Sequence, residues 1–274
     1  MAILEGRISN WLSAGQVAGI LRVYNNKDVV KAVQSAEKAG LGKLYVVVNA
    51  KPDMGTTRTW LKNAGYPESE WLEIIQLEDY SWSKGLNAAL RCIQNNNISA
   101  ENKFKYVLNF SVEVLFTPEH VSRMIDGFSK YDNAGIVGVR FQGKRFTKDK
   151  TVIPLGRSYH HPRNTMMMMS IERLGSFWWT FNPACDELGG MEDIEFILRM
   201  LVYTNRDSVM LNDIVVPLLL GKHYDQEAKE AREQEAMDKI IAMYLEPLQG
   251  DGQSVSNIAL KGKIEAVIKE MQLQ

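Results

Sequence analysis

The sequence predicts an α/β protein in which a mostly parallel β-sheet is flanked by helices. Short runs rich in β-branched residues alternate with longer helical patterns through the first half of the 274-residue chain. Such alternation is typical of parallel sheets. Residues 44–48 are apolar throughout, as in a strand that is buried on both faces. The length suits one large α/β domain with additional elements at its ends.

The expected elements follow one another in a regular order. Strands are predicted at residues 19–24, 44–48, 73–77, 106–110, 135–139 and 165–169, and helices at 28–38, 83–94, 118–131 and 191–203. Pro118 suits a first helical turn, because the backbone N–H that it lacks would have no partner there. In the helix at 191–203, helical spacing predicts a core-facing stripe of Ile194, Ile197, Leu198 and Leu201.

The second half of the chain is less regular. Residues 141–164 are polar and basic and are predicted to form a long irregular segment, which in a compact domain is usually either functional or mobile. Amphipathic patterns at 226–245 and 264–271 predict a helical extension. We therefore divide the chain into an α/β domain, residues 1–225, and a C-terminal helical extension, residues 226–274.

The composition argues against several classes of protein. A formal net charge of −1 gives no reason to expect nucleic acid or an anionic membrane as the main partner. Cys92 and Cys185 are the two cysteines, which favours a reducing compartment over a disulfide framework. The sequence has no secretory signal pattern, and no stretch has the roughly 18 apolar residues needed to span a bilayer. These features predict a cytoplasmic protein without a transmembrane segment.

The segment GGMEDIEFILRM, residues 189–200, is the strongest candidate for chemistry. Glu192 and Asp193 fall in the first turn of a predicted helix, where the helix dipole favours ionised carboxylates. An ionised carboxylate within reach of a hydroxyl can act as a general base. Acidic residues also occupy helix N-termini merely to complement the dipole, so the functional interpretation depends on neighbouring segments.

The pattern GG-x-ED-x-E-x-x-x-R, preceded by aromatic residues, resembles the acceptor-side motif of GT-A fold glycosyltransferases. It is similar both to the inverting family 2 group and to the β-1,4-galactosyltransferase-like group. The resemblance spans residues 18–225 and implies a GT-A type, Rossmann-like sheet. It also implies that Asp193 takes the proton of the acceptor hydroxyl, that Glu192 holds the acceptor, and that Trp178 and Trp179 stack on an acceptor sugar.

The same resemblance implies a nucleotide-sugar donor site after the first two strands. Tyr24 and Asn25 match the segment that contacts the base in this family, although the Pro-Thr half of that segment is missing. Asn49 replaces the aspartate that usually ends the second strand, and Asp53 fits the turn that follows. An asparagine amide offers both a donor and an acceptor to a pyrimidine edge.

Further donor-binding residues are implied in the next helix and strand. Lys84 and Asn87 lie in the helix, where a lysine can meet a diphosphate as a point charge or remain a solvated surface residue. Ser111 and Glu113 stand where the family has its metal-binding Asp-x-Asp motif. Glu113, together with His223 after the last strand, would hold Mn²⁺ or Mg²⁺, because hard cations prefer oxygen-rich sites.

The predicted function is transfer of a sugar from a nucleotide sugar, with a UDP-sugar as the expected donor, to an acceptor hydroxyl with inversion. The altered metal motif also fits a metal-free enzyme in which basic residues neutralise the diphosphate. It also fits a catalytically inactive nucleotide-sugar-binding or scaffold protein, although the intact Glu192–Asp193 pair weakens that interpretation. A sugar-nucleotide nucleotidylyltransferase ranks lower, because that class favours a glycine-rich basic loop where this chain has residues 24–28. The oligomeric state is not predicted.

Overall fold

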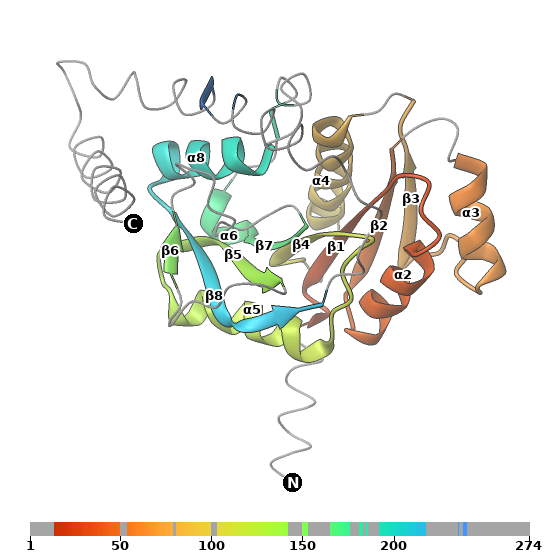
Figure 1. Cartoon of the computed structure of the whole chain (residues 1–274), viewed down its shortest axis with the longest axis horizontal. Helices are drawn as coiled ribbons and strands as arrows, with labels where there is room; N and C mark the ends of the chain where they lie inside the picture. Colours follow the sequence, from red (N-terminus) through yellow and green to blue (C-terminus); the bar gives the residue numbers. More distant parts are fainter. Residues whose placement is uncertain are drawn as a thin grey trace, which may run out of the picture.

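The structure is a computed structural model of the chain. It describes residues 14–49, 54–78, 81–99, 103–141, 150–152, 165–175, 181–182, 185, 192–217, 235 and 238–239. These residues form an α/β fold with a mostly parallel central sheet flanked by helices (Figure 1). The predicted α/β fold with a mostly parallel sheet is therefore confirmed, and the arrangement of its strands is Rossmann-like.

The elements agree closely with those expected from the sequence. The strands are β1 (Val17–Val23), β2 (Lys43–Val48), β3 (Leu72–Gln76), β4 (Tyr106–Ser111), β5 (Ala134–Phe141), β6 (Lys150–Val152), β7 (Met166–Ser170) and β8 (Asp207–Val216). The helices are α2 (Val29–Lys38), α3 (Met54–Asn63), α4 (Trp82–Ser99), α5 (Pro118–Lys130), α6 (Ile171–Leu174) and α8 (Glu192–Thr204). Every strand and helix predicted between residues 19 and 203 is present, whereas α3, α6, β6 and β8 were not predicted.

The strand order places a switch point in the middle of the sheet. The described strands form an 8-stranded sheet in the order β3-β2-β1-β4-β7-β5-β8-β6. β1 pairs in parallel with β2 on one side and with β4 on the other, whereas β7 is antiparallel to β4 and β5. The chain thus builds β2 and β3 on one side of β1 and then crosses to β4 on the other. Ligands of open α/β sheets bind at the carboxyl ends of the strands at such a point.

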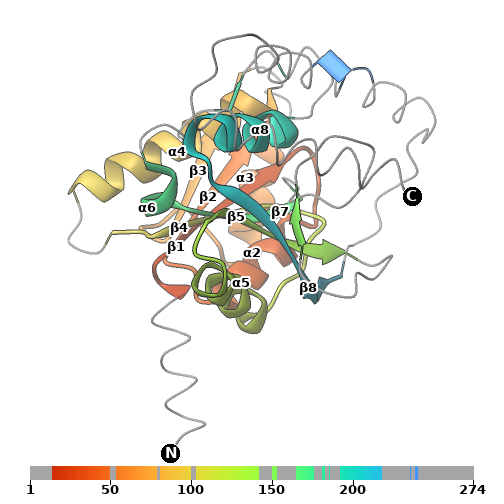
Figure 2. The same ribbon diagram turned by 90° about the vertical axis from the view of Figure 1, so that its left-hand side faces the viewer.

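Helices cover both faces of the sheet (Figures 1 and 2). Because successive side chains of a strand point to opposite faces, β1 contributes to two separate cores. Leu21 and Val23 belong to the core shared with α2 and α5, whereas Ile20 belongs to the core shared with α4, α6 and α8. The predicted stripe of α8 is confirmed, since Ile194, Ile197, Leu198 and Leu201 are all buried.

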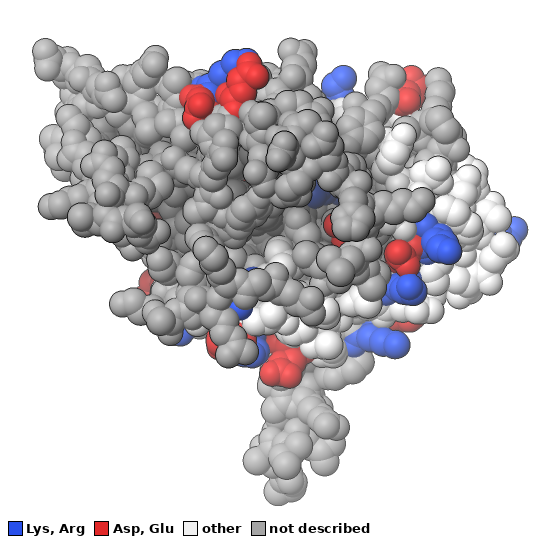
Figure 3. Space-filling model, in the orientation of Figure 1, with Lys and Arg blue, Asp and Glu red and all other residues white. Residues whose placement is uncertain are grey.

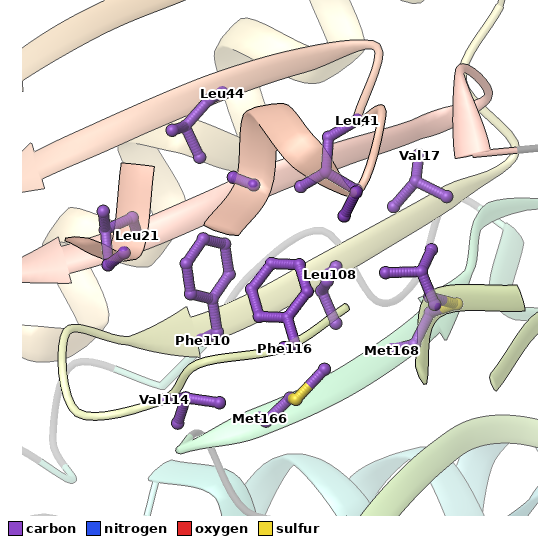
Figure 4. Close-up of a cluster of buried hydrophobic side chains, with 14 of the residues drawn as sticks. Val17, Leu21, Leu41, Leu44, Leu108, Phe110, Val114, Phe116, Met166 and Met168 are labelled. Carbon is purple, nitrogen blue, oxygen red and sulfur yellow. The ribbon is translucent and has the colours of Figure 1, made fainter. Parts of the chain in front are cut away.

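The core beside α2 is filled mainly by aliphatic and aromatic side chains (Figure 4). Phe110 of β4 meets Phe116 edge to face, with ring centroids 4.9 Å apart. Met166 and Met168 of β7 are fully buried in the same core, while Met167 and Met169 enter the core on the other face. The methionine run is therefore a buried strand, as predicted.

Several expectations concern residues outside those described. Most of the segment 141–164 is among them, but its residues 150–152 form β6, so the prediction of an entirely irregular segment is wrong there. The C-terminal extension also lies outside, apart from residues 235 and 238–239.

Within the described part of the chain, no helix is long and apolar enough to cross a membrane. On the described part of the face in Figure 3, acidic and basic side chains are interspersed.

Candidate functional site

Polar side chains gather on one face of the sheet, at its carboxyl edge. Arg22 lies near the end of β1, Asn49 directly follows β2, and Ser111 ends β4. Each of the three lies two or four residues beyond a member of the core under α4 and α8, namely Ile20, Val47 and Val107. Because side chains an even number of residues apart on a strand point to the same face, all three lie on the face covered by these helices. Arg22 and Ser111 are direct partners in the register of β1 and β4. The three residues thus surround the switch point.

Arg22 joins α8 to this edge. Its Nη1 donates a hydrogen bond to Glu192 Oε1 at 3.1 Å, across 170 residues of sequence. Both side chains are buried, with 9% and 7% of their surface exposed. The guanidinium carbon of Arg22 also lies 4.7 Å from the centre of the Trp82 ring, at the start of α4. The ion pair therefore brings the first turn of α8, and Asp193 with it, to the carboxyl edge of the sheet.

The three acidic residues in the first turn of α8 have different surroundings. Glu192 is paired with Arg22, and the buried Glu195 accepts a hydrogen bond from Arg199 at 2.9 Å. Asp193 is only half-buried, and its Oδ1 accepts a hydrogen bond from the backbone N–H of Ile194 at 2.9 Å. Arginines thus pair with Glu192 and Glu195, while the roles of Asp193 as the base and of Glu192 in holding the acceptor stay predictions.

Asn49 positions the N-terminus of α4. The backbone N–H of Ser81 donates to Asn49 Oδ1 at 3.0 Å, and Ser81 Oγ accepts from the backbone N–H of Lys84 at 3.0 Å, which caps the helix. Asn49 Nδ2 is buried and has no hydrogen-bond partner among the described residues. A helix N-terminus favours anions. The exposed Lys84 adds a positive charge in the same turn.

Asn87 connects α4 to the segment that precedes α8. Its Nδ2 donates to the carbonyl oxygen of Phe181 at 2.9 Å, and its Oδ1 accepts from the N–H of Phe181 at 2.5 Å. Phe181 in turn stacks on Phe196 of α8, with ring centroids 4.6 Å apart. These bonds leave Asn87 one amide hydrogen for a ligand. Its role in donor binding stays a prediction.

The connection between β1 and α2 is short. It consists of residues 24–28, in which the Tyr24 side chain is 55% exposed. Asn25 has a φ of 40°, a left-handed conformation that asparagine adopts more readily than most residues. Tyr24 and Asn25 therefore lie at the carboxyl end of β1, as predicted, and the connection leaves no room for a long phosphate-binding loop.

The segment after β4 leads directly into α5. Ser111 Oγ is buried without a hydrogen-bond partner among the described residues, and Glu113 lies half-buried in the turn that follows. Thr117 and His120 then form a capping box, in which the Thr117 N–H donates to His120 Nδ1 at 3.1 Å. Burial lowers the pKa of His120 below its ordinary value of 6.5, which keeps that nitrogen available as an acceptor.

The predicted metal site is only partly within the described residues. Glu113 supplies one carboxylate, and a magnesium ion bound to a diphosphate usually takes one or two. Within the described ranges, no group of three or more His, Cys, Asp or Glu side chains could hold a metal. His223, Asp53, Trp178 and Trp179 lie outside these ranges, so their roles and the Mn²⁺ or Mg²⁺ site stay predictions.

Two buried arginines at this edge were not predicted from the sequence. One is Arg22, and the other is Arg140 near the end of β5, which is 6% exposed. Arg140 Nη1 donates to the carbonyl oxygen and to Oδ1 of Asn212, at 3.0 and 3.1 Å. The available signal was a positive charge at the end of an otherwise apolar strand, in GILRV and GIVGVRF.

Comparison with known proteins gives little guidance to the activity. No protein-family description and no curated protein matches the chain. One similar solved structure is the 4-diphosphocytidyl-2C-methyl-D-erythritol synthase from Anaerococcus prevotii. The two are 10% identical, the match covers 81% of this chain and 96% of that one, and the TM-score is 0.45. A likeness this remote transfers neither reaction nor substrate, so the fold and the site rest on the strand order and contacts described above.

Proposed function

We propose that the chain is a transferase that binds a nucleotide sugar at the carboxyl edge of its sheet and passes the sugar to an acceptor hydroxyl. The Arg22–Glu192 ion pair is the observation that supports this proposal most strongly. Because it joins the end of β1 to the first turn of α8, it brings the candidate base Asp193 to the edge where the switch point lies. Nucleotides bind at that point in sheets of this kind.

The donor side of the proposed site is rich in hydrogen-bond donors. The exposed Lys84 lies in the first turn of α4, at the positive end of the helix dipole, while Asn49 Nδ2 and Ser111 Oγ lie buried at the ends of β2 and β4. Phosphate oxygens need donors of this kind. The exposed Tyr24 and Asn25 are proposed to contact the base, and a UDP-sugar is the proposed donor.

In the proposed reaction Asp193 removes the proton of the acceptor hydroxyl. The hydroxyl oxygen then attacks the anomeric carbon while the bond from that carbon to the diphosphate breaks. The nucleoside diphosphate leaves with the bonding electron pair, and attack from the opposite side inverts the anomeric centre. Trp178 and Trp179 are proposed to stack on the acceptor sugar.

The leaving diphosphate has to be neutralised. We propose that Glu113 and His223 hold Mn²⁺ or Mg²⁺ for this purpose, the cation supplying positive charge to the departing phosphates. Lys84, together with the N-terminus of α4, would contribute to the same task. Titration of UDP with and without Mn²⁺ tests the metal site. In the wild type, Mn²⁺ should raise the affinity for UDP, whereas in Glu113→Ala the affinity for UDP should be the same with and without Mn²⁺.

Turnover tests the base. Calorimetry with UDP and UDP-sugars first identifies a donor, and release of UDP from that donor then measures turnover with water or a panel of saccharide acceptors. Asp193→Asn should leave UDP affinity nearly unchanged and lower turnover at least ~100-fold, as expected for loss of a general base. Asp126→Asn, which removes an exposed carboxylate on α5, is the matched control and should retain full turnover.

The alternatives give different results in the same assays. An inactive binding protein would bind UDP-sugars without releasing UDP under any condition. A nucleotidylyltransferase would release pyrophosphate from a nucleoside triphosphate and a sugar phosphate. If no nucleotide binds with or without metal, the proposed donor site is wrong.

A further inference from the structure

One buried charge of the described structure has no counter-charge. Among the residues that the structure describes, four charged side chains are buried, namely Arg22, Arg140, Glu192 and Glu195. Three of them take part in ion pairs, Arg22 with Glu192 at 3.1 Å and Glu195 with Arg199 at 2.9 Å. Among the described residues Arg140 forms no ion pair, although at 6% exposure it is as deeply buried as Arg22.

The contacts of Arg140 satisfy only part of its guanidinium. Nη1 donates to two oxygen atoms of Asn212, and both acceptors are neutral. Nε is buried and has no hydrogen-bond partner among the described residues. An arginine in a protein cannot relieve this state by losing its proton. Because an unpaired buried charge is strongly unfavourable, a second group with negative charge is expected beside Arg140.

Arg140 lies at the ligand-binding edge of the sheet. It is the second-last residue of β5, two residues beyond Gly138, which pairs with Met167 of β7. Met167 pairs in turn with Asn109, two residues before Ser111. Arg140 and Ser111 therefore lie at the same level on strands two positions apart, about 10 Å from each other at a strand spacing of about 4.8 Å. Ser111 Oγ is a second buried polar atom without a described partner.

We propose that Arg140 binds an oxyanion, a phosphate or carboxylate group carried by a molecule that occupies the carboxyl edge. The planar guanidinium can present Nε and an Nη atom together to two oxygens of one such group. This site lies on β5, on the far side of β4 from the proposed phosphate contacts of Asn49 and α4. It rests on the charge of Arg140 alone, so it holds whether or not the chain transfers sugars.

Thermal unfolding of the full chain tests the proposal. The wild type is compared in sodium chloride, inorganic phosphate and glucuronate at matched ionic strength. An anion at about ten times its Kd should raise the Tm by roughly 3–6 °C. A rise with phosphate alone would identify a phosphate group as the ligand, and a rise with glucuronate alone a carboxylate.

Variants assign the response to Arg140. Arg140→Gln removes the charge and keeps a donor for Asn212, so it should abolish the anion-dependent rise without lowering the Tm in chloride. Arg140→Lys keeps the charge but not the planar pair of donors, and should retain a smaller rise. Arg58→Gln, which changes an arginine on α3 that is paired with Glu68, should behave as the wild type.

Three outcomes would overturn the proposal. The first is a wild type whose Tm is the same in all three salts. The second is an Arg140→Gln variant that responds to the anions as strongly as the wild type. If Arg140→Gln does not fold, the Arg140→Lys variant decides. The third outcome is that this variant responds to the anions as strongly as the wild type.

Discussion

The candidate site depends on polar residues placed at the ends of apolar strands. Arg22 follows a run of buried apolar residues in β1, and its side chain lies against Glu192 and Trp82 with 9% of its surface exposed. Both partners come from helices on the same face of the sheet. A charge in such a position is tolerated because a carboxylate 170 residues away neutralises it. The pair therefore links the correct docking of α8 to the stability of the sheet edge.

Removing one member of this pair should be much more harmful than removing both. Glu192→Gln leaves the Arg22 charge buried without its carboxylate, and we expect a loss of about 3–5 kcal/mol in the free energy of unfolding. The double variant Arg22→Met with Glu192→Leu should recover most of this loss, because no buried charge remains. Urea unfolding of the wild type, both single variants and the double variant measures the coupling. Additive single effects would show that the two residues do not interact.

Sequence reasoning could find some of the residues at this edge but not others. Asn49 and Ser111 follow predicted strands, and Asp193 opens a predicted helix, so their place in the chain indicated the edge of the sheet. The burial of Arg22 and Arg140 depends on which face of each strand is covered and on partners far away in the sequence. A positive charge at the end of an apolar strand is therefore a local signal, but by itself it does not distinguish a buried arginine from an exposed one.

At the scale of elements, strong local patterns predicted the structure and weak ones did not. The helix predicted at 118–131 from Pro118 is confirmed as α5, which ends at Lys130 and has Thr117 as its cap. The helix α4 continues past its predicted end, because Asn97 bonds both the N–H and the carbonyl of Phe104 and so offsets the low helix propensity of an asparagine run. β8 was missed because a register shift against β5 interrupts the alternation of its side chains.

Two helical glycines should respond in opposite ways to alanine. A Cβ at Gly85 of α4 would lie 2.7 Å from Val47 Cγ1 and 3.0 Å from Leu77 Cδ1, whereas a Cβ at Gly55 of α3 would meet no atom within 4 Å. Val47 is buried in β2 and cannot move aside easily. Gly85→Ala should therefore lose stability, since overpacking costs about 1–3 kcal/mol and exceeds the gain in helix propensity.

Gly55→Ala is the control for this prediction. It should gain a few tenths to about 1 kcal/mol from helix propensity alone. Both variants can be measured by urea unfolding against the wild type. Equal stabilisation of the two variants would show that α4 does not pack closely on β2, and it would weaken the placement of the α4 N-terminus at the candidate site.

At the scale of the whole molecule, the parallel order of the strands followed from the alternation of strands and helices, but the direction of β7 did not. The run of four methionines shows that this strand is buried, and a run buried on both faces carries no information about direction. Its reversed place between β4 and β5 is set by tertiary packing. As a result β5 and β8 extend the sheet beyond β4, and Arg140 reaches the same edge as Ser111.

This arrangement predicts a gradient of hydrogen exchange across the sheet. Strands β1 and β4 have neighbours on both sides and helices over both faces, so their amides should exchange only when the protein unfolds globally. The edge strands β3 and β6 lack a neighbour on one side and should exchange faster. Exchange measured by mass spectrometry checks this order, and a β6 as protected as β1 would contradict this sheet.

If a nucleotide binds at the switch point, added UDP should slow exchange at residues 24–28 and in the first turn of α4, because ligands raise the cost of local opening. Slower exchange confined to β3 or β6 would instead place the nucleotide away from Asp193.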